Sequence, residues 1–334
     1  MKIAYLHKED WERDYVENKL QGHEVLFFDD LSSIPQETKS GIEVVSVFVG
    51  DQMNKETIDS FPVLKLIATR STGFDHIDVA HAKSKNIEVV SVPSYGEHTV
   101  AEFAFALLLA ISRKIYESYD KVSVSNSFEQ KNLRGFDLEG KTIGVIGTGK
   151  IGINSIRIAK GFNMNVIASD PYPKNEEAEK MGFKYVELDT LFAESDIITL
   201  HAPYMESTHH MINIETLPKL KKGVFIINTA RGGLIETDAL IEGVNKGIIA
   251  GAGLDVLEEE GAIKEEMELV SNEHPNPEVL KTVLQNHCLA DHPRVIVTPH
   301  NAFNTDEALK RIVDTTIDNI ISFGNGEIKN EVKS

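Results

Sequence analysis

The stretch Gly147-Thr-Gly-Lys-Ile-Gly152 carries the clearest chemical signal in this sequence. Its three glycines have the G-x-G-x-x-G spacing that allows a tight turn, a close approach of backbone N–H groups to a phosphate, and close packing of the next helix. Asp170 follows the last glycine at close to the ~20 residues after which a carboxylate meets the ribose of a bound dinucleotide. These residue types at this spacing predict a dinucleotide site.

The residues on either side of this stretch predict the elements that must position it. A β-branched run at 141–146 precedes the glycines, and apolar residues with helical spacing follow from Ile151 to Phe162. A second strand, Asn165–Ser169, ends directly before Asp170. The phosphates would then lie at the helix N-terminus, where unpaired N–H groups and the helix dipole favour an anion. Because Asp170 would repel a 2′-phosphate and no arginine stands beside it, we expect NAD rather than NADP.

Composition narrows the classes of partner. The chain has 334 residues, enough for two ordinary domains, and its 41% hydrophobic and 26% charged residues are typical of a globular protein. The 34 basic and 52 acidic residues give a formal net charge of −18, so we expect neither nucleic acid nor a membrane as a partner. A small anionic substrate would need a local cation at its site, which makes a well-placed arginine informative.

The use of cysteine and the N-terminal residues bear on the location of the protein. The single cysteine, Cys288, excludes an intrachain disulfide and a thiolate metal cluster. We therefore expect a reducing, cytoplasmic location and no metal site. The stretch Met1-Lys-Ile-Ala-Tyr-Leu6 is followed by charged residues and lacks the core of a signal peptide, so the fold is expected to begin directly.

Strand-like runs alternate with helical or polar stretches along the chain, which predicts α/β domains with parallel sheets covered on both faces. The predicted strands before residue 100 are Lys2–Leu6, Glu24–Phe28, Val44–Val49, Leu64–Thr69 and Glu88–Val92. Those after residue 140 are Lys141–Ile146, Asn165–Ser169, Lys184–Val186, Asp196–His201, Val224–Asn228, Ile249–Val256 and Val295–Thr298. The second set is large enough for a doubly wound sheet of the dinucleotide-binding type.

Three further segments complete the expected organisation. Glu97–Arg113 is apolar on nearly all sides, which predicts a buried linker helix packed between two domains. Glu258 to Pro293 is long and acidic and breaks the alternation, so we expect a surface excursion there. Thr305–Phe323 predicts the last helix, which ends at Gly324.

Ionisable residues follow three of the predicted strands in the second set, namely Arg231, the run Glu258 to Glu260, and His300. Taken alone, each also has an ordinary explanation: a surface arginine, a solvated acidic run and a histidine at the end of a strand, respectively. Ligands of open α/β sheets bind at the carboxyl ends of the strands. Because ionisable residues recur at these strand ends, we expect their side chains to converge over a bound nicotinamide. In the first set, backbone N–H groups of Ser71 to Gly73 could hold a carboxylate, but an ordinary turn before a helix capped by Asp75 is equally open.

Motifs spread over nearly the whole chain resemble those of the D-2-hydroxyacid dehydrogenase family, and within it those of the D-lactate dehydrogenase branch. The motifs are Ser71-Thr-Gly-Phe-Asp-His-Ile-Asp78, Val100-Ala-Glu-Phe-Ala-Phe-Ala106, Gly144-Val-Ile-Gly-Thr-Gly-Lys-Ile-Gly152, Ile227-Asn-Thr-Ala-Arg-Gly232, Gly253-Leu-Asp-Val256 and Thr298-Pro-His300. The resemblance implies an α/β fold in which a doubly wound Rossmann-type NAD domain is inserted in a smaller flavodoxin-like substrate domain. The implied boundaries are residues 99–300 for the NAD domain, and 1–98 with 301–334 for the substrate-binding domain.

The resemblance also implies catalytic roles. The family's catalytic Arg, Glu and His match Arg231, Glu260 and His300, with Glu258 and Glu259 as competing matches for the carboxylate. Arg231 would hold the substrate carboxylate and polarise the adjacent carbonyl. His300 would protonate the carbonyl oxygen in reduction and accept the proton in the reverse direction. A carboxylate beside an imidazole favours the protonated ring, so Glu260 would keep this acid loaded.

The remaining implied contacts are with cofactor and substrate. The cofactor-binding residues would be Gly147, Gly149, Lys150, Ile151, Gly152, Asp170, Ala202, Pro203, Thr208, Thr229, Ala230, Arg231 and Asp255. The substrate-binding residues would be Ser71, Thr72, Gly73, Tyr95, Arg231, His300 and Phe303. We expect His201 to be a neighbour of the cofactor and not the acid, and the adjacent His209 and His210 to point apart.

The expected function is NAD-dependent, reversible hydride transfer between NADH and a small 2-oxoacid, with pyruvate to D-lactate as the first expectation. D-lactate enzymes of the family tend to have an aromatic pair after the catalytic histidine, whereas Ala302-Phe303-Asn304 keeps only Phe303. This leaves open another D-2-hydroxyacid product, such as glycerate, a branched-chain acid or phosphoglycerate. An NAD(H)-sensing binding protein of the same fold is the alternative from another class, and in either case we expect a homodimer.

Overall fold

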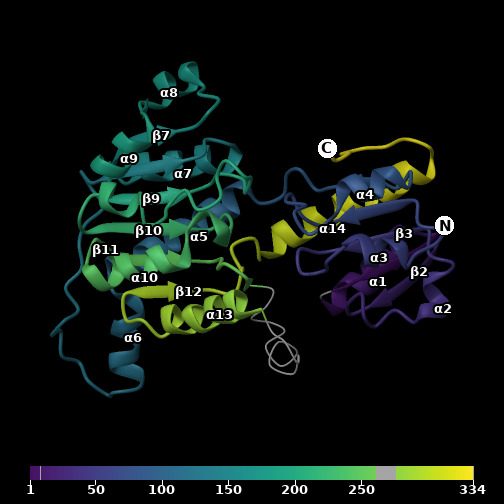
Figure 1. Cartoon of the computed structure of the whole chain (residues 1–334), viewed down its shortest axis with the longest axis horizontal. Helices are drawn as coiled ribbons and strands as arrows, with labels where there is room; N and C mark the ends of the chain where they lie inside the picture. Colours follow the sequence, from purple (N-terminus) through teal and green to yellow (C-terminus); the bar gives the residue numbers. More distant parts are fainter. Residues whose placement is uncertain (8, 261–275, 334) are drawn as a thin grey trace. The chain divides into compact units, whose positions relative to one another are not determined.

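The computed structural model describes residues 1–7, 9–260 and 276–333. The chain divides into two compact units (Figure 1). Met1–Tyr95 and Thr305–Ser334 form one, here called the terminal unit, and Gly96–Asn304 forms the other, the central unit. The assignment of substrate binding to 1–98 with 301–334, and of cofactor binding to 99–300, stays a prediction.

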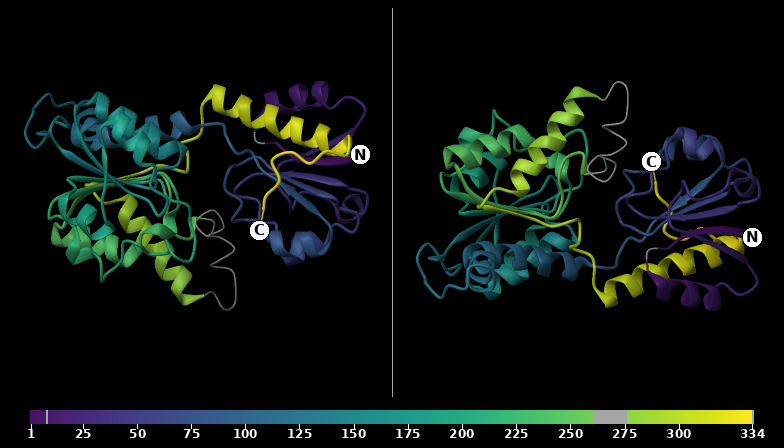
Figure 2. Two further views of the ribbon diagram at one scale, coloured as in Figure 1. Left: turned by 90° about the horizontal axis from the view of Figure 1, so that it is seen from above. Right: turned by 90° about the horizontal axis from the view of Figure 1, so that it is seen from below.

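The terminal unit is built on a five-stranded parallel sheet of order β2-β1-β3-β4-β5. Helices α1 and α14 cover one face of this sheet, and α3 and α4 cover the other (Figure 2). The bounds are β1 Lys2–Leu6, α1 Asp10–Lys19, β2 Glu24–Phe28, α2 Gln36–Lys39, β3 Val44–Val47, α3 Lys55–Asp59, β4 Leu66–Thr69, α4 Val79–Ser84, β5 Glu88–Val90 and α14 Asp306–Gly324. Burial on both faces explains why β1, β3 and β4 are almost continuously apolar.

The central unit contains a seven-stranded parallel sheet of order β12-β11-β10-β9-β6-β7-β8. Its strands are β6 Thr142–Ile146, β7 Asn165–Ser169, β8 Lys184–Tyr185, β9 Ile197–Leu200, β10 Val224–Asn228, β11 Ile249–Leu254 and β12 Val295–Val297. The order reverses between β6 and β9, which is the topological switch point at which doubly wound sheets bind ligands beyond their carboxyl ends. The predicted strands are all present in the two sheets, several of them shorter by one or two residues at an end.

Helices cover both faces of the central sheet. They are α5 Glu97–Ser112, α6 Ile115–Ser123, α7 Lys150–Gly161, α8 Asn175–Met181, α9 Leu188–Glu194, α10 Thr237–Lys246 and α13 Pro277–Ala290, with short 3-10 turns at η1 Leu217–Lys219 and η2 Gly232–Leu234. Helix α5 buries Leu107 and Leu108, but its Glu102 and Ala106 are exposed, so the predicted burial on nearly all sides is only partly found. No helix of the described residues is long and apolar enough to span a bilayer.

The prediction of a surface excursion from Glu258 to Pro293 was wrong for the residues after 275. That part folds as the 14-residue helix α13, which starts with Pro277 after Asn276 accepts a hydrogen bond from the Glu278 amide. Helix α13 buries Val283 and Leu289 against the central unit. The many charged residues conceal this apolar stripe in the sequence. Residues 261–275 of the expected excursion lie outside the described residues.

Candidate active site

The glycine turn joins β6 to α7, and each glycine meets a different steric demand. Gly147 has a φ of +88°, and a Cβ there would lie 2.7 Å from the carbonyl carbon of His201. A Cβ on Gly152 would lie 2.0 Å from the carbonyl oxygen of Gly147, because α7 begins so close to the turn. A Cβ on Gly149 would meet no described atom within 4 Å. The open side at Gly149, beside the N-terminus of α7, suits a phosphate that approaches the backbone.

Asp170, directly after β7, is hydrogen-bonded to the glycine turn. Its Oδ2 accepts from the Thr148 amide at 2.6 Å and from the Thr148 hydroxyl at 2.9 Å, and its Oδ1 accepts from the Tyr172 amide at 2.8 Å. Burial raises the pKa of Asp170, but these hydrogen bonds and the nearby charge of Lys174 outweigh it, so the pKa lies below its ordinary value. The carboxylate is therefore ionised at neutral pH and held beside the turn, as a ribose ligand requires.

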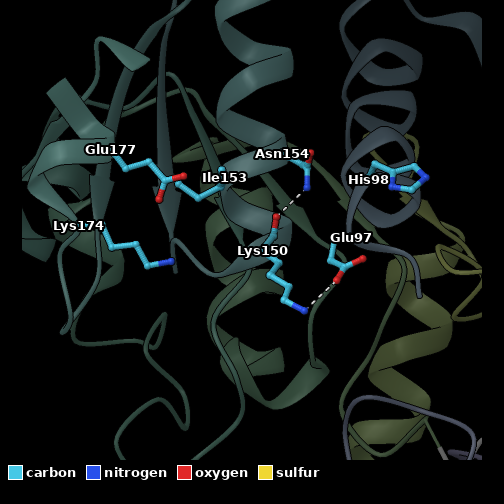
Figure 3. Close-up of a pocket in the computed structure, with 7 residues that line it drawn as sticks. All are labelled: Glu97, His98, Lys150, Ile153, Asn154, Lys174 and Glu177. Carbon is cyan, nitrogen blue, oxygen red and sulfur yellow. Dashed lines mark hydrogen bonds and ion pairs between the residues drawn. The ribbon is translucent and has the colours of Figure 1, made fainter. Parts of the chain in front are cut away.

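A pocket of about 320 Å³ lies beside the first turns of α7 (Figure 3). It is lined by Glu97, His98, Lys150, Ile153, Asn154, Lys174 and Glu177. Lys150 Nζ lies 3.2 Å from Glu97 Oε1, and the carbonyl of Lys150 accepts a hydrogen bond from the Asn154 side chain at 2.9 Å. Lys150, predicted to lie along the pyrophosphate, thus brings its ammonium group to this pocket together with a carboxylate of α5.

Thr229 supplies a separate indication of a ligand. It follows β10 and is only 8% exposed, yet its hydroxyl has no hydrogen-bond partner among the described residues. Buried polar groups are nearly always paired, so this hydroxyl fits one that a bound group would engage. The orphaned hydroxyl, the open side of Gly149 and the ionised Asp170 together fit a dinucleotide.

Arg231 owes its position to a side chain that sequence reasoning did not single out. Asn228, the last residue of β10, accepts a hydrogen bond from the Ala230 amide at 3.0 Å and donates one to the Arg231 carbonyl at 2.9 Å. Arg231 also donates from Nη1 to the Ala230 carbonyl at 2.8 Å. An asparagine whose side chain closes a turn at a strand end is a recognisable signal, and here it fixes where the guanidinium leaves the backbone.

His300 is held by one of the three consecutive glutamates. Its Nδ1 lies 2.7 Å from Glu260 Oε1, while the carboxylate of Glu258 lies 2.5 Å from His210 Nε2 and Glu259 is exposed. With Nδ1 donating to Glu260, Nε2 is the ring nitrogen available to exchange a proton with a ligand. Of the three carboxylates, Glu260 is therefore the one placed to stabilise a protonated His300.

Asp255, predicted as a cofactor contact, is built into the turn that carries His300. Its carboxylate accepts hydrogen bonds from the Thr298 hydroxyl and from the amides of Asn301 and Ala302, the last two at 2.8 Å, and its carbonyl accepts from the His300 amide. Burial raises the pKa of Asp255 against the effect of these bonds. The turn holds His300 at a φ of +53°. A cofactor role for Asp255 stays a prediction.

Three further histidines lie in the segment after β9. Burial lowers the pKa of His201 to about 4, so this ring is neutral near pH 7 and does not carry a proton to donate. His209 and His210 were expected to point apart, and this was wrong: their rings stack with centroids 3.7 Å apart. His210 has a positive φ of +49°, so the backbone is not extended there and the two adjacent side chains need not point to opposite sides.

The other predicted cofactor contacts in this segment are Ala202, Pro203 and Thr208. Ala202 is buried two residues after the end of β9. The Thr208 hydroxyl donates to the Pro203 carbonyl at 2.7 Å and accepts from the Met205 amide at 2.8 Å, which closes the turn between them. These bonds leave the predicted contact of Thr208 with the cofactor untested.

In the terminal unit, hydroxyl groups fix the loop predicted to bind substrate. Ser71 donates to the Gly73 carbonyl at 2.6 Å and lies 2.6 Å from the Thr69 hydroxyl, and Thr72 donates to the Val92 carbonyl at 2.7 Å. The helix after this loop is capped by Asp78, which accepts from the His81 amide, so the alternative of a cap by Asp75 was wrong.

The two aromatic residues predicted to contact substrate lie in different units. Tyr95 ends the first part of the terminal unit, where its carbonyl accepts from Arg311 Nε at 2.5 Å. Phe303 follows the buried Ala302 near the end of the central unit.

The carboxyl ends of β6, β10, β11 and β12 lie along one edge of the parallel central sheet. This edge carries a dinucleotide turn, an arginine and an imidazole paired with a carboxylate. These are the groups that a nicotinamide-dependent oxidoreductase needs to bind its cofactor, bind an anionic substrate and transfer a proton. Among the described residues, no group of three or more His, Cys, Asp and Glu is placed to hold a metal ion.

Comparison with known proteins identifies the family. Residues 105–302 match the model of the D-isomer specific 2-hydroxyacid dehydrogenase, NAD binding domain. D-lactate dehydrogenase of Escherichia coli is 37% identical over 332 residues, 98% of both chains, and an aromatic 2-oxoacid reductase of Clostridium sporogenes is 38% identical over 296 residues, 88% of this chain and 86% of its own. The crystal structure of D-lactate dehydrogenase from Aquifex aeolicus, complexed with NAD and lactic acid, has a TM-score of 0.88 at 34% identity and covers 98% of this chain and 96% of its own.

This chain belongs to the D-2-hydroxyacid dehydrogenase family, and it resembles the D-lactate dehydrogenases within it. The predictions of a Rossmann-type α/β fold, of an NAD-dependent 2-hydroxyacid dehydrogenase and of NAD as the cofactor are confirmed.

Proposed function

We propose that this enzyme reduces pyruvate to D-lactate, and runs the reverse reaction, with Arg231, Glu260 and His300 as its catalytic residues. The observation that carries the proposal is the 2.7 Å hydrogen bond between His300 Nδ1 and Glu260 Oε1. It supports an imidazole that is oriented by a carboxylate and able to exchange a proton through Nε2.

The chain's own residues divide the remaining work. Arg231 binds the substrate carboxylate, since a guanidinium matches a carboxylate with two parallel hydrogen bonds, and it supplies the local cation that a protein of net charge −18 needs to attract an anion. His300 donates its proton to the carbonyl oxygen in reduction and takes it back in oxidation. Glu260 stabilises the protonated ring. Bound NADH supplies the hydride.

The cofactor would be held by the predicted residues of the central unit. Asp170 would accept from the ribose hydroxyls, the N-terminus of α7 would bind the pyrophosphate, and Thr229 would offer its orphaned hydroxyl near the nicotinamide end. This arrangement is supported by the ionised state of Asp170 and by the open side of Gly149.

A larger 2-oxoacid is the second candidate substrate, and a specific observation favours it. Phe303 is followed by Asn304, a short polar residue at a position where D-lactate enzymes of the family tend to have a second aromatic residue. The Asn304 amide donates to Asn301 Oδ1 at 2.9 Å. The smaller side chain favours room for a larger substrate. A relative of 38% identity is named an aromatic 2-oxoacid reductase. Glycerate and branched-chain acids remain weaker candidates, and phosphoglycerate is the weakest because no extra basic cluster marks a phosphate pocket in the sequence.

Oxidation of NADH in the presence of a panel of 2-oxoacids tests the proposal. We expect the highest kcat/KM with pyruvate. A higher value with phenylpyruvate would reject pyruvate in favour of the larger substrate. Tight binding of NADH with turnover of none of the acids would reject both and favour an NAD(H)-sensing binding protein.

We propose further that the enzyme is a homodimer. Six large apolar side chains of helix α6 and of the chain after it are exposed: Ile115, Tyr116, Tyr119, Val122, Val124 and Phe128, which are 57%, 62%, 68%, 42%, 73% and 88% exposed. Exposed apolar patches of this kind mark association surfaces, and a second copy of this chain is the occupant expected for a dehydrogenase of this family. The cytoplasmic location stays a prediction that rests on the use of cysteine.

The mass in solution, measured by light scattering, tests the dimer. We expect twice the chain mass for the wild type and the chain mass for Tyr119→Glu combined with Phe128→Glu. Val63→Glu, which changes an exposed apolar side chain elsewhere, is the control and should leave the dimer intact. A monomeric wild type would contradict the proposal.

A further inference from the structure

Glu258 lies where four segments of the central unit meet. Its Oε1 lies 2.5 Å from His210 Nε2, and its Oε2 accepts from the amide and the hydroxyl of Thr237 at 2.7 and 2.6 Å. Its carbonyl accepts from Asn286 Nδ2 at 2.7 Å. The side chain is only 16% exposed. Both oxygens of a mostly buried carboxylate are thus used in hydrogen bonds to groups distant in sequence.

Two of these bonds place the carboxylate at the N-terminus of α10. Thr237 is the first residue of α10, and Glu236 at the N-cap makes no side-chain capping hydrogen bond to the helix. Glu258 takes over this task from another segment, and its negative charge interacts favourably with the helix dipole. The carboxylate therefore anchors its own segment to a rigid element.

The anchored segment touches the loop of Arg231. A Cβ on Gly232 would lie 2.0 Å from the carbonyl carbon of Leu257 and 2.4 Å from the amide nitrogen of Glu258. The residue after Arg231 therefore packs directly on the peptide that leads into Glu258. Glu260, two residues further on, holds His300 Nδ1.

His210 connects the same carboxylate to the segment after β9, which carries the predicted cofactor contacts. The amide of His210 donates to the Gly233 carbonyl at 2.9 Å, and its ring stacks on His209. The His210 ring thus bridges from this segment to Glu258. Glu258, the Arg231 loop and the predicted cofactor segment form one hydrogen-bonded and packed assembly.

We propose that Glu258 is a positioning residue of this enzyme: its carboxylate fixes Glu260 relative to Arg231, with His210 as its clamp from the cofactor segment. The inference rests on the proposed roles of Glu260 and Arg231. Both carboxylate oxygens of Glu258 are used by His210 and Thr237, so the role assigned to it is positioning and not contact with substrate or cofactor. Glu258 acts by holding the turn that carries Glu260. This role distinguishes Glu258 from the adjacent Glu259 and Glu260.

Steady-state kinetics with Glu258→Ala and Glu258→Gln test the proposal, with the exposed neighbour changed in Glu259→Gln as the matched control. A misplacement of about 1 Å in a catalytic group costs ~10²-fold in rate, so we expect kcat of Glu258→Ala to fall by about 10- to 100-fold. The Kd of NADH, from fluorescence titration, should change much less than kcat, because the glycine turn is untouched and only the His210 clamp of the cofactor segment is lost. Glu258→Gln should recover part of kcat, since its amide oxygen still accepts from Thr237, and Glu259→Gln should match the wild type.

Amide hydrogen exchange of the peptide 255–260 gives a readout that does not depend on activity. We expect faster exchange there in Glu258→Ala and in His210→Ala, and wild-type exchange in Glu259→Gln. Normal kcat per NADH-binding site in Glu258→Ala, or unchanged exchange of this peptide, would overturn the inference. A wild type that reduces no 2-oxoacid would reject the proposed function instead, and the exchange measurement would still test the anchor.

Discussion

Replacing Glu260 by glutamine tests the central pair of the proposed site most directly. His300 Nδ1 and Glu260 Oε1 are 2.7 Å apart, and the two side chains are 20% and 38% exposed. A hydrogen bond to a charged group contributes ~1.5–3 kcal/mol, and because the carboxylate is more than a third exposed, solvent screening places this bond at the lower end. A loss of about 1.5 kcal/mol corresponds to a tenfold lower rate.

The assay is kcat/KM for pyruvate reduction at one neutral pH by the wild type, Glu260→Gln and Glu259→Gln. Because the carboxylate orients the His300 ring through Nδ1, and glutamine replaces this charged partner by a neutral one, kcat/KM should fall about tenfold in Glu260→Gln. Glu259→Gln should follow the wild type. A kcat/KM of Glu260→Gln within twofold of the wild type would refute the pairing of Glu260 with His300.

The remaining predictions concern the glycine turn and its carboxylate. Asp170→Ala should raise the KM for NADH by about 10-fold or more, because it removes charge-assisted hydrogen bonds. It should also reduce the preference for NADH over NADPH, because it removes the repulsion of a 2′-phosphate. Comparison of kcat/KM for the two cofactors checks this, and an intact preference would contradict it. Since the folded-state pKa of Asp170 is lowered, its ionised form stabilises the fold above the unfolded pKa of ~3.9, and this contribution is lost as the pH falls through the folded value. Thermal unfolding of Asp170→Asn should therefore depend less on pH in acid than that of the wild type, and equal acid sensitivity would argue against the contribution. Gly152→Ala should lower stability by ~1–3 kcal/mol because its Cβ meets the Gly147 carbonyl, whereas Gly149→Ala should keep the thermal stability and weaken NADH binding; equal unfolding temperatures for the two variants would refute the steric argument.

Much of the fold follows from local patterns. The β-branched runs separated by polar and helical stretches predict the strands of both sheets, because an apolar run of this length is stable only when both of its faces are covered. The helix α13 was missed since its apolar positions, Val283 and Leu289, stand among charged and polar residues. The cap at Asp78 in place of Asp75 was missed for a related reason, because two aspartates stand close to the helix start.

The sequence by itself determined the dinucleotide turn and its carboxylate, since Gly147, Gly152 and Asp170 act within one strand–turn–helix–strand unit whose spacing is fixed by local geometry. It also supplied an arginine, three glutamates and a histidine at strand ends. Only the tertiary structure decided that Glu260 pairs with His300 while Glu258 binds His210 and Thr237. These partners are separated by tens of residues, and which of three adjacent carboxylates reaches which group depends on the path of the backbone between distant elements. That path is set by the packing of whole elements and not by the residue types at the contact.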